Sequence, residues 1–243
     1  SLVGSEMCIR DSQYTLDTAF DISSKNAGSE EKLALNPAGD PISNQTDDIT
    51  FNNDGTKLFA ISDNGAMNIH TLSTPYDISS GVTLVADDGI NWRTYKEPWG
   101  SSNTTMLPQT IRFNNDGTKM YLTEAVINTT DPQESVGVVQ YNLATPFVPS
   151  STTTVQVLNL RAQFPKTNIA IHAMNFDDDG TRMYVSAGNF LLKTDHPHAV
   201  YELSIPFEIS SAKHVGTFNF VNASGGGVAA VGGVFSDDGN KYY

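Results

Sequence analysis

The stretch Phe51-Asn-Asn-Asp-Gly-Thr-Lys-Leu-Phe59 decides the fold of this chain, because close copies of it occur three more times. The copies begin at positions 51, 113, 176 and 235, so successive starts are 62, 63 and 59 residues apart. Such a regular period predicts one supersecondary unit stacked on copies of itself, since a single unit cannot bury its apolar face alone. The other copies are Phe113–Tyr121, Phe176–Tyr184 and Phe235–Tyr243.

A second phrase alternates with the first. It has the form Tyr-x-Leu-x-Thr-Pro-Phe-Asp-Ile-Ser-Ser, with small changes from copy to copy. Two alternating signals at one period indicate a unit built from two hairpins. The copies of this second phrase are Tyr14–Ser24, His70–Ser80, Tyr141–Ser151 and Tyr201–Ser211.

The residue pattern inside each unit predicts β-strands. Ile111 and Phe113 alternate with Thr110 and Arg112, which is the two-residue period of a pleated strand. Asp-Gly between two apolar runs predicts a tight hairpin turn, because Gly accepts a positive φ. Each unit is therefore expected to hold four antiparallel strands. In the second unit the later three are expected at 119–123, 138–143 and 155–160.

Four antiparallel strands at a period near 60 describe a propeller blade with loops added to the usual ~40–50 residues. On the two repeated phrases, residues 13–243 resemble bacterial β-propeller repeats of the YVTN/WD40-like kind. They are most similar to the tandem Phe-x-x-Asp-Gly-Thr-Lys-Met-Tyr and Thr-Pro-Phe-Asp-Ile-Ser blades of environmental bacterial and phage proteins. The resemblance implies an all-β fold, a β-propeller of four-stranded antiparallel blades. It implies no function, since propellers carry many unrelated activities.

The repeats also divide the chain. Residues 1–12 fit no repeat and resemble the translation of a sequencing adapter, so we expect a non-native or disordered leader. The incomplete units at the two ends are complementary: they can join into one composite blade of a four-blade ring, or they can be the edges of a larger ring. We favour a fragment of a larger ring, because no Met begins the chain and Tyr243 falls within an expected strand. The expected units are a half blade at 13–36, blades at 47–86, 108–160 and 170–220, and a half blade at 229–243.

Composition excludes several classes of function. A net charge of −13 argues against binding to nucleic acid, which needs Lys and Arg to replace counterions, and against anionic lipid. Cys8 in the leader is the one cysteine, so the repeats hold no disulfide or thiolate metal site. Apolar stretches such as 228–234 are too short to insert into a membrane. We expect a secreted, cell-surface or periplasmic bacterial protein without a cofactor, whose partner is a glycan or a protein.

The connections between strands predict which face binds that partner. If the strands of a blade are lettered A to D, the A–B and C–D connections share one rim and the B–C and D–A connections share the other. The repeated phrases form the first two connections, whereas the other two differ in every blade. Because variable loops on a repeated scaffold commonly carry recognition, we expect the ligand at the B–C/D–A rim.

The connection at residues 87–103 is the richest in aromatic and basic side chains, and it contains both tryptophans of the chain. We single out Trp92, Arg93, Tyr95 and Trp99 as candidate ligand-binding residues. Aromatic side chains on a long polar loop can stack on sugar rings or anchor a partner. The alternative is that the tryptophans fold back over the blade, since a long loop needs a small core of its own.

A second candidate is a metal site. His196 and His198 are two positions apart, so in an extended segment both would face one side, with Asp195 beside them and His172 as a further ligand. The alternative is an ordinary polar loop. The consecutive aspartates at 177–179 do not have the spacing of a calcium-binding EF-hand loop, and their role as turn formers suffices.

Three functions remain open from the sequence. We favour a non-catalytic recognition propeller. The alternative is a propeller enzyme of the lactonase or quinoprotein-dehydrogenase type, which needs polar groups that converge at the mouth of the central channel. The third is a structural spacer. The candidates for the enzyme are His172, Asp195, His196 and Glu124.

Overall fold

The computed structural model shows an all-β chain that forms part of a β-propeller. In the described residues, three antiparallel sheets have four strands each and a fourth sheet has two. Each four-stranded sheet keeps its strands in chain order, so that neighbouring strands are joined by simple hairpins. The structure describes residues 10–18, 21–34, 46–62, 64–80, 83–87, 90, 92, 105–127, 136–164, 169–189 and 197–219.

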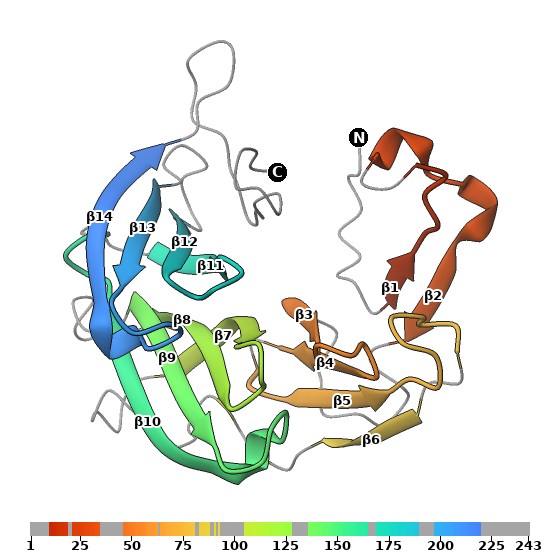
Figure 1. Cartoon of the computed structure of the whole chain (residues 1–243), viewed down its shortest axis with the longest axis horizontal. Helices are drawn as coiled ribbons and strands as arrows, with labels where there is room; N and C mark the ends of the chain where they lie inside the picture. Colours follow the sequence, from red (N-terminus) through yellow and green to blue (C-terminus); the bar gives the residue numbers. More distant parts are fainter. Residues whose placement is uncertain are drawn as a thin grey trace.

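The three full sheets are the predicted blades. Figure 1 looks down on them: β3, β7 and β11 lie innermost, and β6, β10 and β14 lie outermost. Blade 1 consists of β3 (Asp48–Phe51), β4 (Lys57–Ile61), β5 (Met67–Thr71) and β6 (Thr83–Asp87). Blade 2 consists of β7 (Thr105–Phe113), β8 (Lys119–Ile127), β9 (Val136–Leu143) and β10 (Thr152–Asn159). Blade 3 consists of β11 (Ile169–Phe176), β12 (Arg182–Asn189), β13 (Pro197–Leu203) and β14 (Ala212–Asn219).

A half blade precedes blade 1. Its strands β1 (Arg10–Gln13) and β2 (Glu31–Ala34) pair antiparallel, and an isolated bridge joins Leu16 to Lys25. β1 begins at Arg10, so its first three residues belong to the segment that the sequence analysis set aside as a leader. Short 3-10 turns form the last three residues of three copies of the second phrase: η1 (Ile22–Ser24), η3 (Pro149–Ser151) and η4 (Ile209–Ser211). A further 3-10 turn, η2 (Ala27–Ser29), follows the first copy.

The two repeated phrases lock together within each blade. In blade 2, Gly117 adopts φ +71° in the A–B turn, and the ring of Phe147 from the C–D turn covers it so closely that a Cβ would come within 2.3 Å. The Phe147 N–H donates to the Gly117 carbonyl oxygen at 2.9 Å, and Phe147 itself has φ +54°. Blade 1 repeats this contact with Gly55 and Tyr76, and blade 3 repeats it with Gly180 and Phe207.

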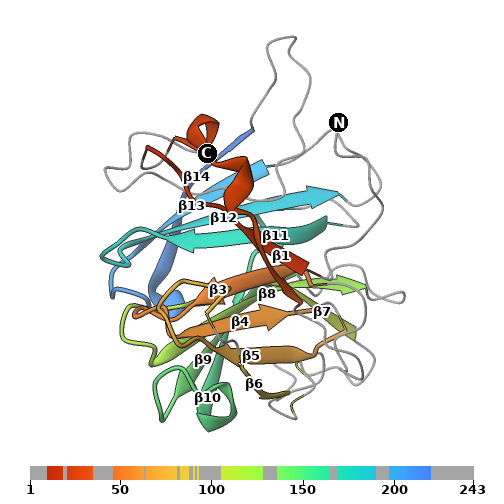
Figure 2. The same ribbon diagram turned by 90° about the vertical axis from the view of Figure 1, so that its right-hand side faces the viewer.

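This contact fixes the arrangement of the rims. The bond from one turn to the other places the A–B and C–D connections of a blade on the same rim, as the alternating strand directions predict. Figure 2 shows the β3–β4, β7–β8 and β11–β12 turns together on one side of the molecule. The structure therefore confirms that the repeated phrases share one rim, which we call the locked rim.

The core lies between blades and not within any one of them. Strand side chains alternate: Met120 and Leu122 on β8 pack toward blade 1, whereas Tyr121 packs toward blade 3. The same alternation gives one buried cluster between blades 1 and 2 and another between blades 2 and 3. A smaller cluster contains Leu33 of the half blade and Leu58 of blade 1. Each blade therefore needs a neighbour to cover its apolar faces.

A glutamine connects consecutive blades near the locked rim. Gln140 on β9 accepts a hydrogen bond from the Ile209 N–H at 3.0 Å, and its Nε2 lies 3.2 Å from Glu208 Oε2, both in the C–D turn of blade 3. Gln13 of the half blade makes the matching contact with blade 1. It accepts from the Ile78 N–H at 2.9 Å and donates to the Tyr76 carbonyl oxygen at 2.8 Å.

The interface between blades 1 and 2 lacks this glutamine contact, because the residue on each side of it is different. Ile69 occupies the position in blade 1 that corresponds to Gln140, directly before the repeated Tyr or His. Pro149 occupies the position in blade 2 that corresponds to Ile209, and proline has no N–H to donate. Ile69 removes the side-chain acceptor, and Pro149 removes the backbone N–H that would need it. Neither substitution therefore leaves a buried polar group unsatisfied at this position.

Candidate functional site

We call the rim opposite the locked rim, where the strands of each blade enter and leave the B–C and D–A connections, the variable rim. In blade 1 the B–C turn runs from Ser62 to Ala66, and the Trp92 N–H from the D–A connection donates to the Gly65 carbonyl oxygen at 2.8 Å. In blade 1 the described parts of the two connections therefore lie side by side. Most residues of the corresponding connections in blades 2 and 3 lie outside the described residues, so a binding role for this rim stays a prediction.

The ring of Trp92 is not accessible to a ligand. Its side chain is fully buried in the cluster between blades 1 and 2, and it contacts the Tyr141 ring edge-on, with 5.2 Å between ring centroids. The structure thus supports the alternative in which this tryptophan folds back over the blade, and it contradicts a sugar-stacking role for Trp92. Arg93, Tyr95 and Trp99 lie outside the described residues, so their candidacy stays a prediction.

The candidate metal ligands are described only in part. His198 on β13 is buried, its Nδ1 lies 2.7 Å from Ser186 Oγ, and its ring stacks on Phe218 at 5.3 Å. Asp195 and His196 lie outside the described residues. Among the residues that the structure does describe, no group of three or more His, Cys, Asp or Glu side chains is placed to hold a metal ion.

His172 lies in a β-bulge of the innermost strand of blade 3. The pairing of β11 with β12 shifts between Ile171 and Ala173, and His172 is the extra residue. Gln109 is the extra residue of a bulge at the equivalent position of β7. The His172 carbonyl oxygen accepts a hydrogen bond from Thr110 Oγ1 at 3.2 Å, which ties the two inner strands together along their middle part. Glu124, the remaining enzyme candidate, pairs through its backbone with Pro108 and Gly137.

A polar chain that the sequence analysis missed joins the inner strands of all three blades. Arg112 on β7 donates through NH1 to Asp48 Oδ2 on β3 at 2.5 Å and through Nε to Asn175 Oδ1 on β11 at 3.0 Å. Asp48 also accepts from the Ile111 N–H at 3.0 Å. Burial raises the pKa of Asp48 above its ordinary value, against the lowering effect of the Arg112 charge. Residues of three repeats contribute to this chain, so no single repeat could reveal it.

The aspartate side chains of the A–B turns accept hydrogen bonds from threonines of the same turns. Asp116 Oδ1 accepts from the Thr118 hydroxyl at 2.5 Å and from the Thr118 N–H at 2.9 Å. These hydrogen bonds hold the pKa of Asp116 below its ordinary value. Asp54 and Asp179 make the same pair of bonds with Thr56 and Thr181. This arrangement agrees with a turn-forming role for these carboxylates.

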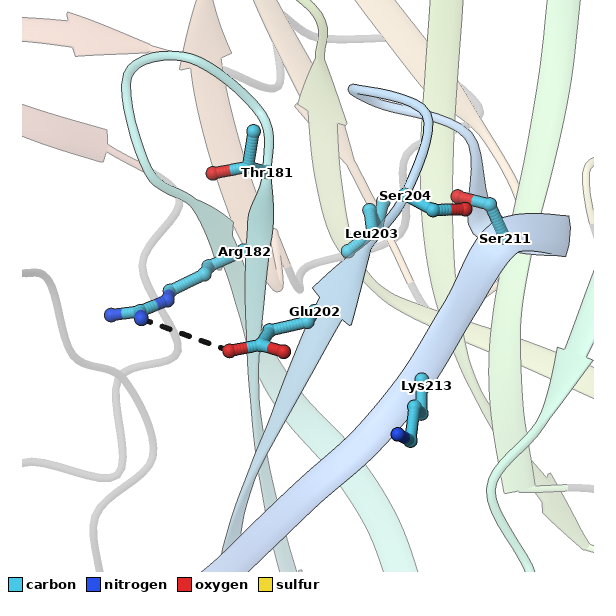
Figure 3. A pocket seen from close by; sticks show the side chains of 7 residues that line it. All are labelled: Thr181, Arg182, Glu202, Leu203, Ser204, Ser211 and Lys213. Carbon is cyan, nitrogen blue, oxygen red and sulfur yellow. Dashed lines mark ion pairs between the residues drawn. The ribbon is translucent and has the colours of Figure 1, made fainter.

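An open hollow of about 460 Å³ lies on blade 3 (Figure 3). Its charged lining comes from three neighbouring strands: Arg182 on β12, Glu202 on β13 and Lys213 on β14. Arg182 and Glu202 form an exposed ion pair with 3.8 Å between NH2 and Oε1. The hollow lies near the locked rim, away from the residues that the sequence analysis proposed.

Comparisons with known proteins do not assign a function to this chain. No family model matches the chain, and no curated protein matches it in sequence. Among solved structures, the β-propeller domain of Cps50 (Swd1) from Myceliophteria thermophila resembles it with a TM-score of 0.40 and 12% sequence identity. That match covers 78% of this chain and 48% of that domain, so the chain spans about half its length. In the described part of the chain, no helix has the length and apolar character needed to cross a membrane.

Proposed function

We propose that this chain is a non-catalytic recognition module of a secreted or cell-surface bacterial protein. Its propeller of YVTN/WD40-like blades would bind a glycan or a protein partner through the variable rim. The observation that carries this proposal is the difference between the two rims. The same backbone bond closes the locked rim in all three blades, whereas the connections on the other rim differ from blade to blade.

The locked rim is suited to holding the fold. Its turns are fixed by the Gly and aromatic contact within a blade and by contacts between blades, such as the one that Gln140 makes with Ile209. Changes of sequence there would break these contacts. The variable rim is free of this constraint, because a hairpin connection can change in length and composition without altering the strands that it joins. New binding surfaces can therefore arise there at little cost to stability.

The β6–β7 connection supplies the strongest candidate surface on this rim. Trp92 anchors the connection in the core and binds it to the B–C turn through Gly65. Arg93, Tyr95 and Trp99 follow within seven residues of that anchor. Aromatic rings stack on the apolar faces of sugars and also serve as anchors in protein interfaces, while an arginine donates several hydrogen bonds.

The test is binding of the 243-residue chain to a glycan array and, in parallel, to a panel of candidate proteins. Trp99→Ala and Tyr95→Ala are expected to weaken binding by at least about tenfold, since anchor residues commonly contribute more than ~1.4 kcal/mol. Ser150→Ala, at an exposed position beside the locked rim, is the matched control and should bind like the wild type. Equal binding by all three variants would contradict the role of this connection.

A further inference from the structure

The outermost strand of blade 2, β10, leaves one edge of its sheet open. In the described part of the chain, β10 pairs with β9 and with no other strand. Its side chains pack on both sides: Val155 and Val157 against the cluster with blade 1, and Leu158 against the cluster with blade 3. Figure 1 shows β10 on the outer circumference of the arc. The open edge therefore belongs to a blade that has a neighbour on each face.

The backbone of β10 directs hydrogen-bonding groups outward at three positions. The Leu160 N–H donates to the Val136 carbonyl oxygen at 2.8 Å, so the backbone groups of Leu160 face β9. In an antiparallel ladder, successive residues face the partner strand and the open edge in turn. The residues whose N–H and C=O face the open edge are therefore Val155, Val157 and Asn159. Such a row of unpaired groups is a template for a further strand.

β10 lacks the residues that commonly keep an edge strand from pairing, which are charged side chains and proline. After a bulge between Thr152 and Thr154, the strand continues Thr154-Val-Gln-Val-Leu-Asn159, with no charged residue, Pro or Gly. The outermost strands of the other two blades differ, since β6 ends at Asp87 and β14 contains Lys213. β10 is thus the outer strand of the three that is best suited to pair with another chain.

The charge around β10 favours a second copy of this chain as the partner. The net charge of −13 means that most contacts between two copies would bring carboxylates together. Between Glu134 and Asp177, however, the sequence has no acidic residue and two basic ones, Arg161 and Lys166. This segment includes β9 and β10, so two copies that meet at β10 largely avoid the repulsion.

We propose that β10 pairs antiparallel with β10 of a second copy, so that two four-stranded blades join into one continuous sheet across a two-fold axis. Main-chain hydrogen bonds between open edges are a recurring mode of recognition. The register that uses all three outward residues sets Val157 opposite its own copy and Val155 opposite Asn159. The contact is isologous and closes on itself, so assembly stops at a dimer. This inference concerns self-association and is independent of the ligand proposed for the variable rim.

The dimer is expected to be weak and to depend on salt. One pair of strands buries less surface than the ~1,200 Å² of the smaller standard interfaces, so the dimer dissociates readily. The remaining acidic surfaces of the two copies repel each other at low ionic strength. Salt screens this repulsion, because the Debye length falls from about 30 Å at 0.01 M to about 8 Å at 0.15 M. Association should therefore tighten over that range.

Sedimentation equilibrium of the full chain tests the proposal. The wild type is expected to be a mixture of monomer and dimer at about 0.1–1 mM. Val157→Pro removes the outward N–H at the two-fold axis and no bond to β9, so it should weaken association by about tenfold or more. Thr217→Pro, at the corresponding position of β14, is the matched control and should associate like the wild type.

Hydrogen exchange locates the contact without any substitution. Between a dilute and a concentrated sample of wild type, backbone N–H exchange should slow in β10 and stay unchanged in β14. A wild type that is still monomeric at about 1 mM would overturn the proposal. A dimer whose exchange does not slow in β10 would overturn it as well, and so would a folded Val157→Pro variant that associates as strongly as wild type.

Discussion

Gln140 Oε1 accepts a hydrogen bond of 3.0 Å from the backbone N–H of Ile209 across the boundary between blades 2 and 3. Ile209 is buried, so its N–H has no route to water in place of this partner. The side chain thus satisfies a donor that the next blade brings into the interface. A packed stack of sheets needs such contacts, because the apolar cluster between blades tolerates buried polar groups only when they are paired.

Replacement of Gln140 by Leu is expected to lower the free energy of unfolding by about 1–3 kcal/mol, the usual cost of an unpaired buried donor. Denaturant unfolding followed by circular dichroism measures this. Gln156→Leu is the matched control on the neighbouring strand. Gln156 Oε1 is buried without a hydrogen-bond partner in the described part of the chain, so its loss should change stability little. Equal effects of the two substitutions would contradict the assigned role of Gln140.

Gly117→Ala is expected to destabilise the chain by about 1–3 kcal/mol, because a residue with Cβ is strained at positive φ. The new Cβ would also meet the Phe147 ring at 2.3 Å. Gly216→Ala on β14 is the control, since a Cβ there meets nothing within 4 Å. It should be neutral or slightly stabilising. Thermal unfolding of both variants decides the matter, and a neutral Gly117→Ala would show that the turn and the ring do not lock together.

The sequence predicted the blades well because each blade carries its own signals. Period-two alternation at Ile111 and Phe113 and the Asp-Gly turns depend on neighbours along the chain, and the structure places strands and hairpins there. The strands of blade 2 are longer than expected, since β8 continues to Ile127. The positive φ of Phe147 was not predicted, because it depends on the glycine beneath the ring and not on the local sequence.

The Lys119–Glu208 pair predicts a defined response to acid. Burial raises the pKa of Glu208, but the hydrogen bonds and charge of Lys119 and the amide of Gln140 outweigh it, so the pKa lies below its ordinary 4.5. A lowered folded-state pKa adds stability above the unfolded pKa, and this stability is lost as the pH falls through the folded value. The advantage of wild type over Glu208→Gln should therefore shrink from about pH 5 to about pH 3.

Equilibrium unfolding of wild type and Glu208→Gln at several pH values checks this. The same substitution at Glu202, which lies in an exposed ion pair, serves as the control and should give a small difference at every pH. If the gap between wild type and Glu208→Gln stays constant or widens below pH 4.5, the assigned direction of the Glu208 pKa is wrong.

Trp92→Ala is expected to cost about 3–5 kcal/mol of stability, the range for removal of a large buried aromatic side chain. The edge-on contact with Tyr141 adds to the burial, so Trp92→Phe should recover part of the loss. Ile205→Ala at an exposed apolar position is the control and should change stability by less than about 0.5 kcal/mol. Unchanged stability of Trp92→Ala would restore its candidacy as a ligand-binding residue.

The candidate site was less predictable than the fold. The composition of residues 87–103 marked the β6–β7 connection as unusual, but it could not show which tryptophan enters the core. That choice depends on the space between blades 1 and 2 and on the carbonyl oxygen of Gly65. The chain from Asp48 through Arg112 to Asn175 escaped prediction for the same reason, because its members meet only when three blades are stacked.

A substitution scan of both rims, with stability and binding measured for every variant, tests the division of roles most directly. Changes on the locked rim, such as Gly117→Ala, should lower the free energy of unfolding while folded protein still binds its partner. Changes on the variable rim, such as Trp99→Ala, should abolish binding with less than about 0.5 kcal/mol of lost stability. Binding losses that cluster on the locked rim, or that simply follow the loss of stability, would contradict the account.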